Sequence, residues 1–110
     1  MAASPDSVVV RVFGDLSLAA VAEPLVTSIG ARSGFDVARL DELVAAVDVV
    51  SRSMPSDAAR TLEAGRDGAD LHVRLQPVDV ARLAANRAAL DALVTSVQVG
   101  EGEVELRVGG

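Results

Sequence analysis

Apolar and polar positions along this chain follow two periods, which divide it into eight elements. Runs rich in β-branched residues predict strands, and runs with an apolar residue every three or four positions predict helices. The predicted order is strand, helix, helix, strand, strand, helix, strand, strand, with short connections. Strands joined mainly as hairpins, with three helices gathered on one face, predict an α+β two-layer sandwich with a mixed, mostly antiparallel sheet. The expected strands are Ser7 to Gly14, 59–65, 69–77, 97–99 and Val104 to Val108, and the expected helices are 17–34, 36–52 and 79–94.

Local signals define the ends of these elements. The first strand is apolar at nearly every position, so we expect it to be buried on both faces. Asp15 or Ser17 can cap the first helix, and Gly34 is a helix stop. Pro24 either kinks this helix or marks its start, and we favour one kinked helix. Asp67-Gly68 between two alternating runs predicts a hairpin.

The second helix, which Asp36 caps, carries more apolar surface than one packed face needs. At roughly 100° per residue, one stripe faces the core, and it contains Val37, Leu40, Leu43, Val44, Val47 and Val50. Ala38, Ala45 and Val49 lie on the opposite side, next to Ser53. Something else should cover that side, either the chain itself or a second chain.

Composition narrows the classes of function. The chain has 110 residues, which we interpret as one domain over 1–110 with residues 1–6 flexible. A net charge of −6 disfavours nucleic acids and anionic membranes as partners. Cysteine and lysine are absent, which excludes thiolate chemistry, a Schiff base and a P-loop. The first residues, MAASPDS, do not form a signal peptide, so we expect a soluble, cytoplasmic protein.

Few polar residues are candidates for chemistry. His72 lies within an alternating strand, and we interpret it as a solvent-facing histidine rather than a general base. Asp41, Glu42 and Asp48 are interpreted as a solvated flank of the second helix rather than a cation site. Arg87 and Asp91, four residues apart, predict a surface ion pair.

Several phrases resemble the GHKL ATPase fold, in particular the small anti-sigma serine kinases. They are GFDVARLDEL leading into AAVD on the second helix, the strand LHVRL, and the ending ALDALVTSVQV with GEVELRV. The resemblance spans nearly the whole chain. It implies a helix that carries a Glu directly after AVD and an Asn four residues later, where the Glu orients the attacking group and the Asn holds magnesium.

The chain departs from this family at the residues that perform its chemistry. Val49 and Ser53 stand at the matching positions; an isopropyl group cannot act as a base, and a lone hydroxyl is a weak magnesium ligand. The family's adenine-reading Asp-x-Gly corresponds to Asp79 with no glycine after it, in Gln76-Pro77-Val78-Asp79-Val80. The glycine-rich lid is missing. The resemblance therefore implies a scaffold that has lost its nucleotide chemistry.

We accordingly expect a non-catalytic regulatory or protein-interaction domain of bacterial transcription control, with no catalytic residue, metal or cofactor. The expected partner is a sigma factor, an anti-anti-sigma protein or a second copy in a homodimer. Ala38, Ala45, Val49 and Ser53 form the candidate face, covered either as a filled former pocket or by a partner. Two alternatives stay open: an active serine kinase with a divergent pocket, and a STAS-like anti-anti-sigma protein, which VVVRVFGDLSLAAVAEPL resembles.

Overall fold

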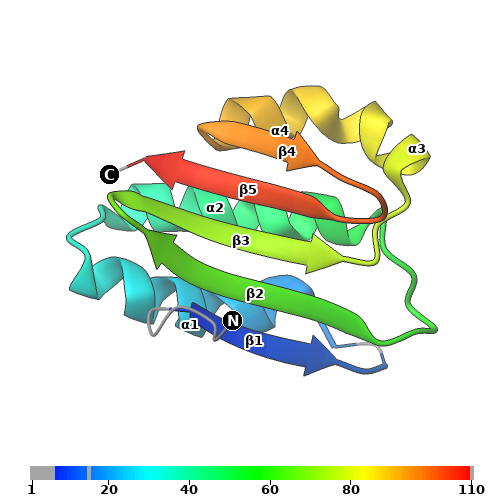
Figure 1. Ribbon diagram of the computed structural model, residues 1–110, viewed down its shortest axis with the longest axis horizontal. Helices are drawn as coiled ribbons and strands as arrows, with labels where there is room; N and C mark the ends of the chain where they lie inside the picture. The colour runs from blue at the N-terminus through cyan, green and yellow to red at the C-terminus, as the bar shows by residue number, and fades with distance from the viewer. Residues whose placement is uncertain (1–6, 15, 110) are drawn as a thin grey trace.

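The protein is an α+β fold in which helices pack against one face of an open, five-stranded antiparallel sheet (Figure 1). The computed structural model describes residues 7–14 and 16–109, so the expectations for residues 1–6 and for Asp15 as a cap lie outside the described part. The elements are β1 Ser7–Val12, α1 Leu18–Arg32, α2 Val37–Ser51, β2 Arg60–Asp67, β3 Asp70–Gln76, α3 Val80–Leu83, the 3-10 turn η1 Ala84–Asn86, α4 Arg87–Leu93, β4 Ser96–Val99 and β5 Val104–Gly109.

The predicted element order is confirmed, except that α3, η1 and α4 take the place of one third helix, and the sheet order is β1-β2-β3-β5-β4. Every neighbouring pair of these strands is antiparallel, so the expectation of a mixed sheet is wrong. Each of the pairs β2–β3 and β4–β5 is a hairpin, and such connections give antiparallel neighbours. The turn of the first hairpin contains Gly68 at φ 64°, as the Asp-Gly signal predicts.

The ends of α1 follow the predicted signals. The Ser17 side chain caps the helix by accepting the backbone N–H of Ala20 at 3.2 Å. Pro24 lies inside one continuous helix, so it does not mark the start of that helix. At the other end Gly34 has φ 78°, and the N–H groups of Gly34 and Phe35 donate back to the carbonyls of Ala31 and Gly30. This pattern is a Schellman motif, which satisfies the last carbonyls of the helix.

The expectation that β1 is buried on both faces is wrong, because β1 is an edge strand. Val9 is 54% exposed and Val8 is 40% exposed, whereas Val12 is buried. Val8 and Val10 lie opposite Ala64 and Leu62 of β2, which places them on the helix-facing side of the sheet. A run of valines shows that a strand forms, but it does not show how many neighbours that strand has.

A buried arginine, which the sequence pattern did not reveal, anchors the connection between β1 and α1. Arg60 is only 6% exposed, and its Nη2 donates to the carbonyls of Gly14 and Leu16 at 2.7 and 2.8 Å. Both carbonyls lie in a loop that has no strand to pair with. The charged guanidinium therefore satisfies two backbone carbonyls that a neighbouring strand would otherwise satisfy.

The sheet face away from the helices is covered by crossed ion pairs. Arg74 of β3 bridges Glu63 on β2 and Glu105 on β5, at 3.2 and 3.6 Å. Arg107 of β5 contacts Asp67 at 3.2 Å, and hydrogen bonding to that carboxylate raises the pKa of the guanidinium above its ordinary value. The charges alternate in sign across neighbouring strands, which favours a face that remains in water.

The helix α2 lies between α1 and α4 and over the sheet, but the buried side of α2 is rotated from the predicted stripe. Val37, expected in the core, is 72% exposed, while Ala46, which the stripe omits, is fully buried. The rotation is roughly 45° at 100° per residue. The helices α1 and α4, packed on the two flanks of α2, determine which of its residues are buried. The apolar pattern alone does not determine this. The buried residues of α2 are Leu40, Leu43, Ala46, Val47 and Val50.

Matched substitutions on α2 test this rotation. Val47→Ala should lower the free energy of unfolding by about 2 kcal/mol, since it removes buried methyl groups and leaves a cavity. Val37→Ala, the same chemical change at an exposed position, should alter it by less than about 0.5 kcal/mol. Urea denaturation of both variants measures the difference. Equal losses would contradict the observed orientation of α2.

Candidate functional site

The four residues of the predicted candidate face do not share one environment. Ala38 and Ala45 are exposed on the outer surface of α2. Val49 is half-buried and packs against the core. Ser53, two residues beyond the end of α2, is 1% exposed. The side of α2 that carries these residues is therefore open to solvent at its start and covered by the chain itself at its end.

The covered end of α2 contacts the segment that joins β3 to α3. The backbone N–H of Asp79 donates to the carbonyl of Ser53 at 2.7 Å, and the N–H of Val78 donates to the carbonyl of Gly102 at 2.8 Å. Val78 is buried, as is Met54, which follows Ser53. These two hydrogen bonds connect the β3–α3 segment to the end of α2 and to the β4–β5 turn. We call this place the junction, and the buried side chains of Met54 and Val78 lie beside it.

Asp79 serves a structural role at this junction. Its Oδ1 accepts the backbone N–H of Arg82 at 3.2 Å, which makes Asp79 the N-cap of α3 as predicted. The preceding Gln76-Pro77 peptide bond is cis, so the chain turns sharply out of β3. No residue separates the cap from the helix, and the carboxylate that would read a base in the resembled family is used to start a helix.

Most of the other polar candidates have local partners, and Asp41, also on α2, is exposed. Asp48 pairs with Arg52 at 3.2 Å and Glu42 with Arg39 at 3.7 Å, on the exposed surface of α2. Arg87 and Asp91 form the predicted surface pair at 3.2 Å. Within residues 7–14 and 16–109, no group of three or more histidine or acidic side chains is arranged to hold a metal ion.

His72 lies on the open face of the sheet, as its alternation with Leu71 and Val73 predicts. The ring lies over Gly65 of the neighbouring strand, close enough that a Cβ on that glycine would meet Cε1 at 3.1 Å. Its Nδ1 is buried and has no hydrogen-bond partner among the described residues. The same Cβ would meet the Cβ of Ser7 at 2.8 Å, so the ring and the serine side chain enclose this glycine from the two neighbouring strands.

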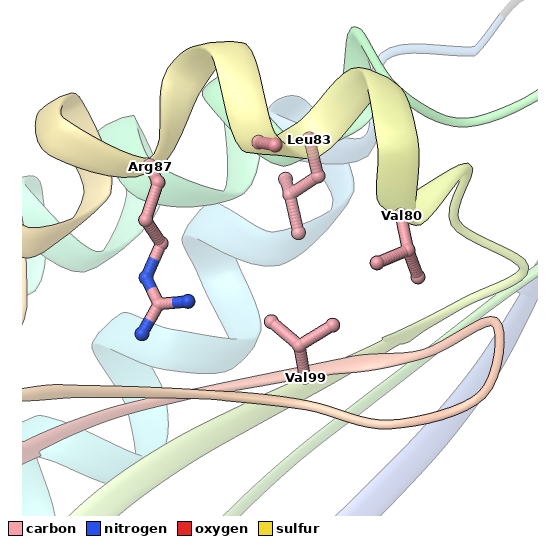
Figure 2. A pocket seen from close by; sticks show the side chains of 5 residues that line it. Val80, Leu83, Arg87 and Val99 are labelled. Carbon is pink, nitrogen blue, oxygen red and sulfur yellow. The ribbon is translucent and has the colours of Figure 1, made fainter.

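An open apolar groove lies beside β4, and the sequence pattern did not reveal it. Its cavity has a volume of about 410 Å³ and lies between the α3–α4 segment and the edge strand (Figure 2). Val80 and Val99 are 40% and 38% exposed in it, while Leu83 is buried at its base. Arg87 closes one end of the groove. Its lining residues are Val80, Leu83, Ala84, Arg87 and Val99.

The helical segment that lines the groove is interrupted. A single helix is predicted over 79–94, but the structure breaks it into α3, η1 and α4. Asn86, at φ −110° and ψ 7°, departs from helical geometry. Val80 of α3 and Val99 of β4 lie on facing sides of the groove and are both partly exposed (Figure 2).

No protein-family model matches the chain, and no curated protein matches it. Across residues 7–14 and 16–109, the structure contains no helix with the length and apolar content to cross a membrane.

The junction at Ser53 yields a testable expectation. Ser53 Oγ is buried and has no hydrogen-bond partner among the described residues, so the hydroxyl is desolvated without compensation. Ser53→Ala should therefore raise the free energy of unfolding by up to about 1 kcal/mol. Ser51→Ala is the matched control, because Ser51 Oγ donates to the Asp48 carbonyl at 2.6 Å and its loss should be neutral or destabilising. A clear destabilisation by Ser53→Ala, measured by urea denaturation, would show that this hydroxyl has a partner.

Proposed function

We propose that this protein is a non-enzymatic interaction domain, built on a scaffold like that of the anti-sigma serine kinases, which regulates a partner by contact and binds no nucleotide. The observation that carries the proposal is the junction at the end of α2. There Ser53 is buried and its carbonyl accepts the N–H of Asp79 at 2.7 Å. The two segments that would face each other across a nucleotide are hydrogen-bonded directly.

The chemistry of the junction supports loss of nucleotide binding as strongly as its geometry does. Phosphoryl transfer depends on a positioned base and on a magnesium ion held by oxygen ligands. At the matching positions Val49 packs into the core and Ser53 is enclosed. Asp79, the remaining acid, accepts the backbone N–H of Arg82 at the start of α3.

The element order favours this scaffold over the STAS-like alternative. Helices α1 and α2 follow one another with no strand between them. In the resembled STAS fold, strands and helices alternate through this region. The five-stranded sheet has its helices on one side, as this scaffold implies, although its neighbouring strands are all antiparallel and not mixed.

Two features of the described surface support a binding role. The described surface combines a solvated, charge-paired sheet face with an apolar groove beside a sheet edge. We propose this groove, where Val80 and Val99 are partly exposed, as the surface that contacts another protein. By the resemblance, the partner is a sigma factor, an anti-anti-sigma protein or a second copy of this chain.

Thermal unfolding with and without Mg-ATP tests the loss of the nucleotide site. A ligand that binds only the folded state must raise its stability, by about 2.7 kcal/mol at a hundredfold excess over Kd. We expect a Tm unchanged within about 1 °C at millimolar Mg-ATP, and no phosphate release; for a domain of this size that free energy would shift Tm by at least several degrees. An active anti-sigma kinase measured in parallel is the positive control. A rise of several degrees that also requires magnesium would overturn the proposal.

A further inference from the structure

The outer edge of β4 carries backbone groups that β5 does not use. Within the described part of the chain, β4 pairs with β5 alone. The N–H of Gly100 donates to the carbonyl of Glu103 at 2.9 Å, and hydrogen-bonded pairs alternate with non-hydrogen-bonded pairs along an antiparallel ladder. Gln98 therefore bonds within the sheet, whereas Val97 and Val99 direct their N–H and C=O groups away from β5. These outward groups are the positions at which another strand could add.

The side chains of this edge would suit many different strands. Gln98 is a neutral amide, exposed on the open face of the sheet. The side chains of Val97 and Val99 lie on the helix-facing side of the sheet, and Val99 is partly exposed. Neutral and apolar side chains do not repel an added strand as like charges would. Folded chains aggregate through such edges unless a structural feature blocks them.

A charged side chain occupies one of the outward acceptors of this edge. Arg87 Nη2 donates to the carbonyl of Val97 at 3.3 Å, from the side opposite β5. Figure 2 shows the Arg87 side chain extending from its helix toward the strand that carries Val99. Neighbouring strands lie about 4.7–4.9 Å apart, so the guanidinium stands where the backbone of an added strand would run. It also brings a donor to the oxygen that an N–H of the added strand would need.

A carboxylate holds the guanidinium in this place. Arg87 Nε donates to Asp91 Oδ1 at 3.2 Å, and both residues belong to α4, one helical turn apart. Because the guanidinium is planar, a bond at Nε restricts the direction in which Nη2 points. The Arg87 side chain is half-exposed, so its charge keeps contact with water. An added strand would remove that water as well as the hydrogen bond.

We infer that Arg87, positioned by Asp91, is a strap that blocks strand addition at β4 and keeps copies of the chain from associating through this edge. An added strand must displace a charge-assisted hydrogen bond and cover a hydrated guanidinium. In exchange, a strand of four residues offers few backbone hydrogen bonds. The strap acts at the sheet edge, so this role is separate from the proposed loss of nucleotide binding at the junction.

Sedimentation equilibrium of the full chain and of its Arg87→Ala variant, each from roughly 10 µM to 1 mM, tests the strap. A second copy serves as the probe, because every copy carries two strand edges. Arg87→Ala uncovers the Val97 carbonyl and should raise the self-association constant by about tenfold or more, since hydrogen bonds to charged groups are among the stronger ones. Equal association of the two proteins would overturn the inference.

Two controls separate the strap from general effects of the substitution. Arg52 forms the same kind of ion pair with Asp48, four residues apart and also at 3.2 Å, but at the end of α2. Arg52→Ala removes the same charge and should leave the association constant unchanged. Val47→Ala, which destabilises the core, should also leave it unchanged. Association of either control as strong as that of Arg87→Ala would assign the effect to charge or stability and contradict the strap.

Hydrogen exchange followed by NMR locates the association. In Arg87→Ala, the amides of Val97 and Val99 should gain protection as the protein concentration rises. The same gain in the unsubstituted chain would show that the edge is not blocked, and a gain confined to β1 would place the contact at the opposite edge; either result would overturn the inference. Circular dichroism and thermal unfolding verify that the fold of the variant is unchanged.

Asp91→Ala tests the positioning of the strap. This variant keeps the guanidinium but removes the carboxylate that orients it, so association should increase by a smaller factor than in Arg87→Ala. The concentration-dependent protection should again lie at Val97 and Val99. An association constant equal to that of the unsubstituted chain would show that Asp91 does not position Arg87.

Discussion

The enclosure of α2 is the constraint on which the rest of this structure depends. The helix has α1 on one side, α4 on the other and the sheet beneath it, so its core-facing valines and leucines lose nearly all contact with water. A chain with two phenylalanines and no tryptophan or tyrosine has few large side chains, and its core is built mainly from leucine, valine and alanine. Small aliphatic side chains fill space only when backbones approach closely, which demands a compact arrangement around one central helix.

Close packing around α2 also explains why its end is sealed. A solvated pocket beside this helix would require the β3–α3 connection to stand away from it and polar side chains to line the gap. Here the connection turns at the cis Gln76-Pro77 bond and donates its next free N–H groups, from Val78 and Asp79, to Gly102 and Ser53. Both N–H groups are thus satisfied by other parts of the chain. The same short connection that closes the junction ends in the cap of α3.

The sequence predicted the elements well because their signals are local. Ser17, Gly34, Asp79 and the Asp67-Gly68 turn each act within a few residues of themselves, through a cap, a positive φ or a tight turn. Strand order is not local. The exposure of Val8 and Val9, the mistaken core position of Val37 and the burial of Arg60 all follow from which element lies beside which. No period in the sequence carries that information.

For the candidate site too, the sequence predicted what depends on local residues and not what depends on neighbouring elements. That Val49 and Ser53 cannot perform phosphoryl chemistry is a statement about side chains, and the sequence was sufficient for it. That Ala38 and Ala45 are exposed while Ser53 is enclosed required the tertiary neighbours of α2. The groove beside β4 had no visible signal, because its walls come from residues 80–87 and from Val99, which meet only after the third helix breaks at Asn86.

An edge strand such as β4 exposes a ladder that can pair with other chains, and natural proteins usually protect such edges. Both edges of this sheet are exposed, but they are protected to different degrees. Strand β1 has six residues, and its Val8 is partly exposed. Strand β4 has only four residues, and Arg87 donates a hydrogen bond to the outward carbonyl of Val97. A short edge and a charged side chain limit uncontrolled addition of further strands.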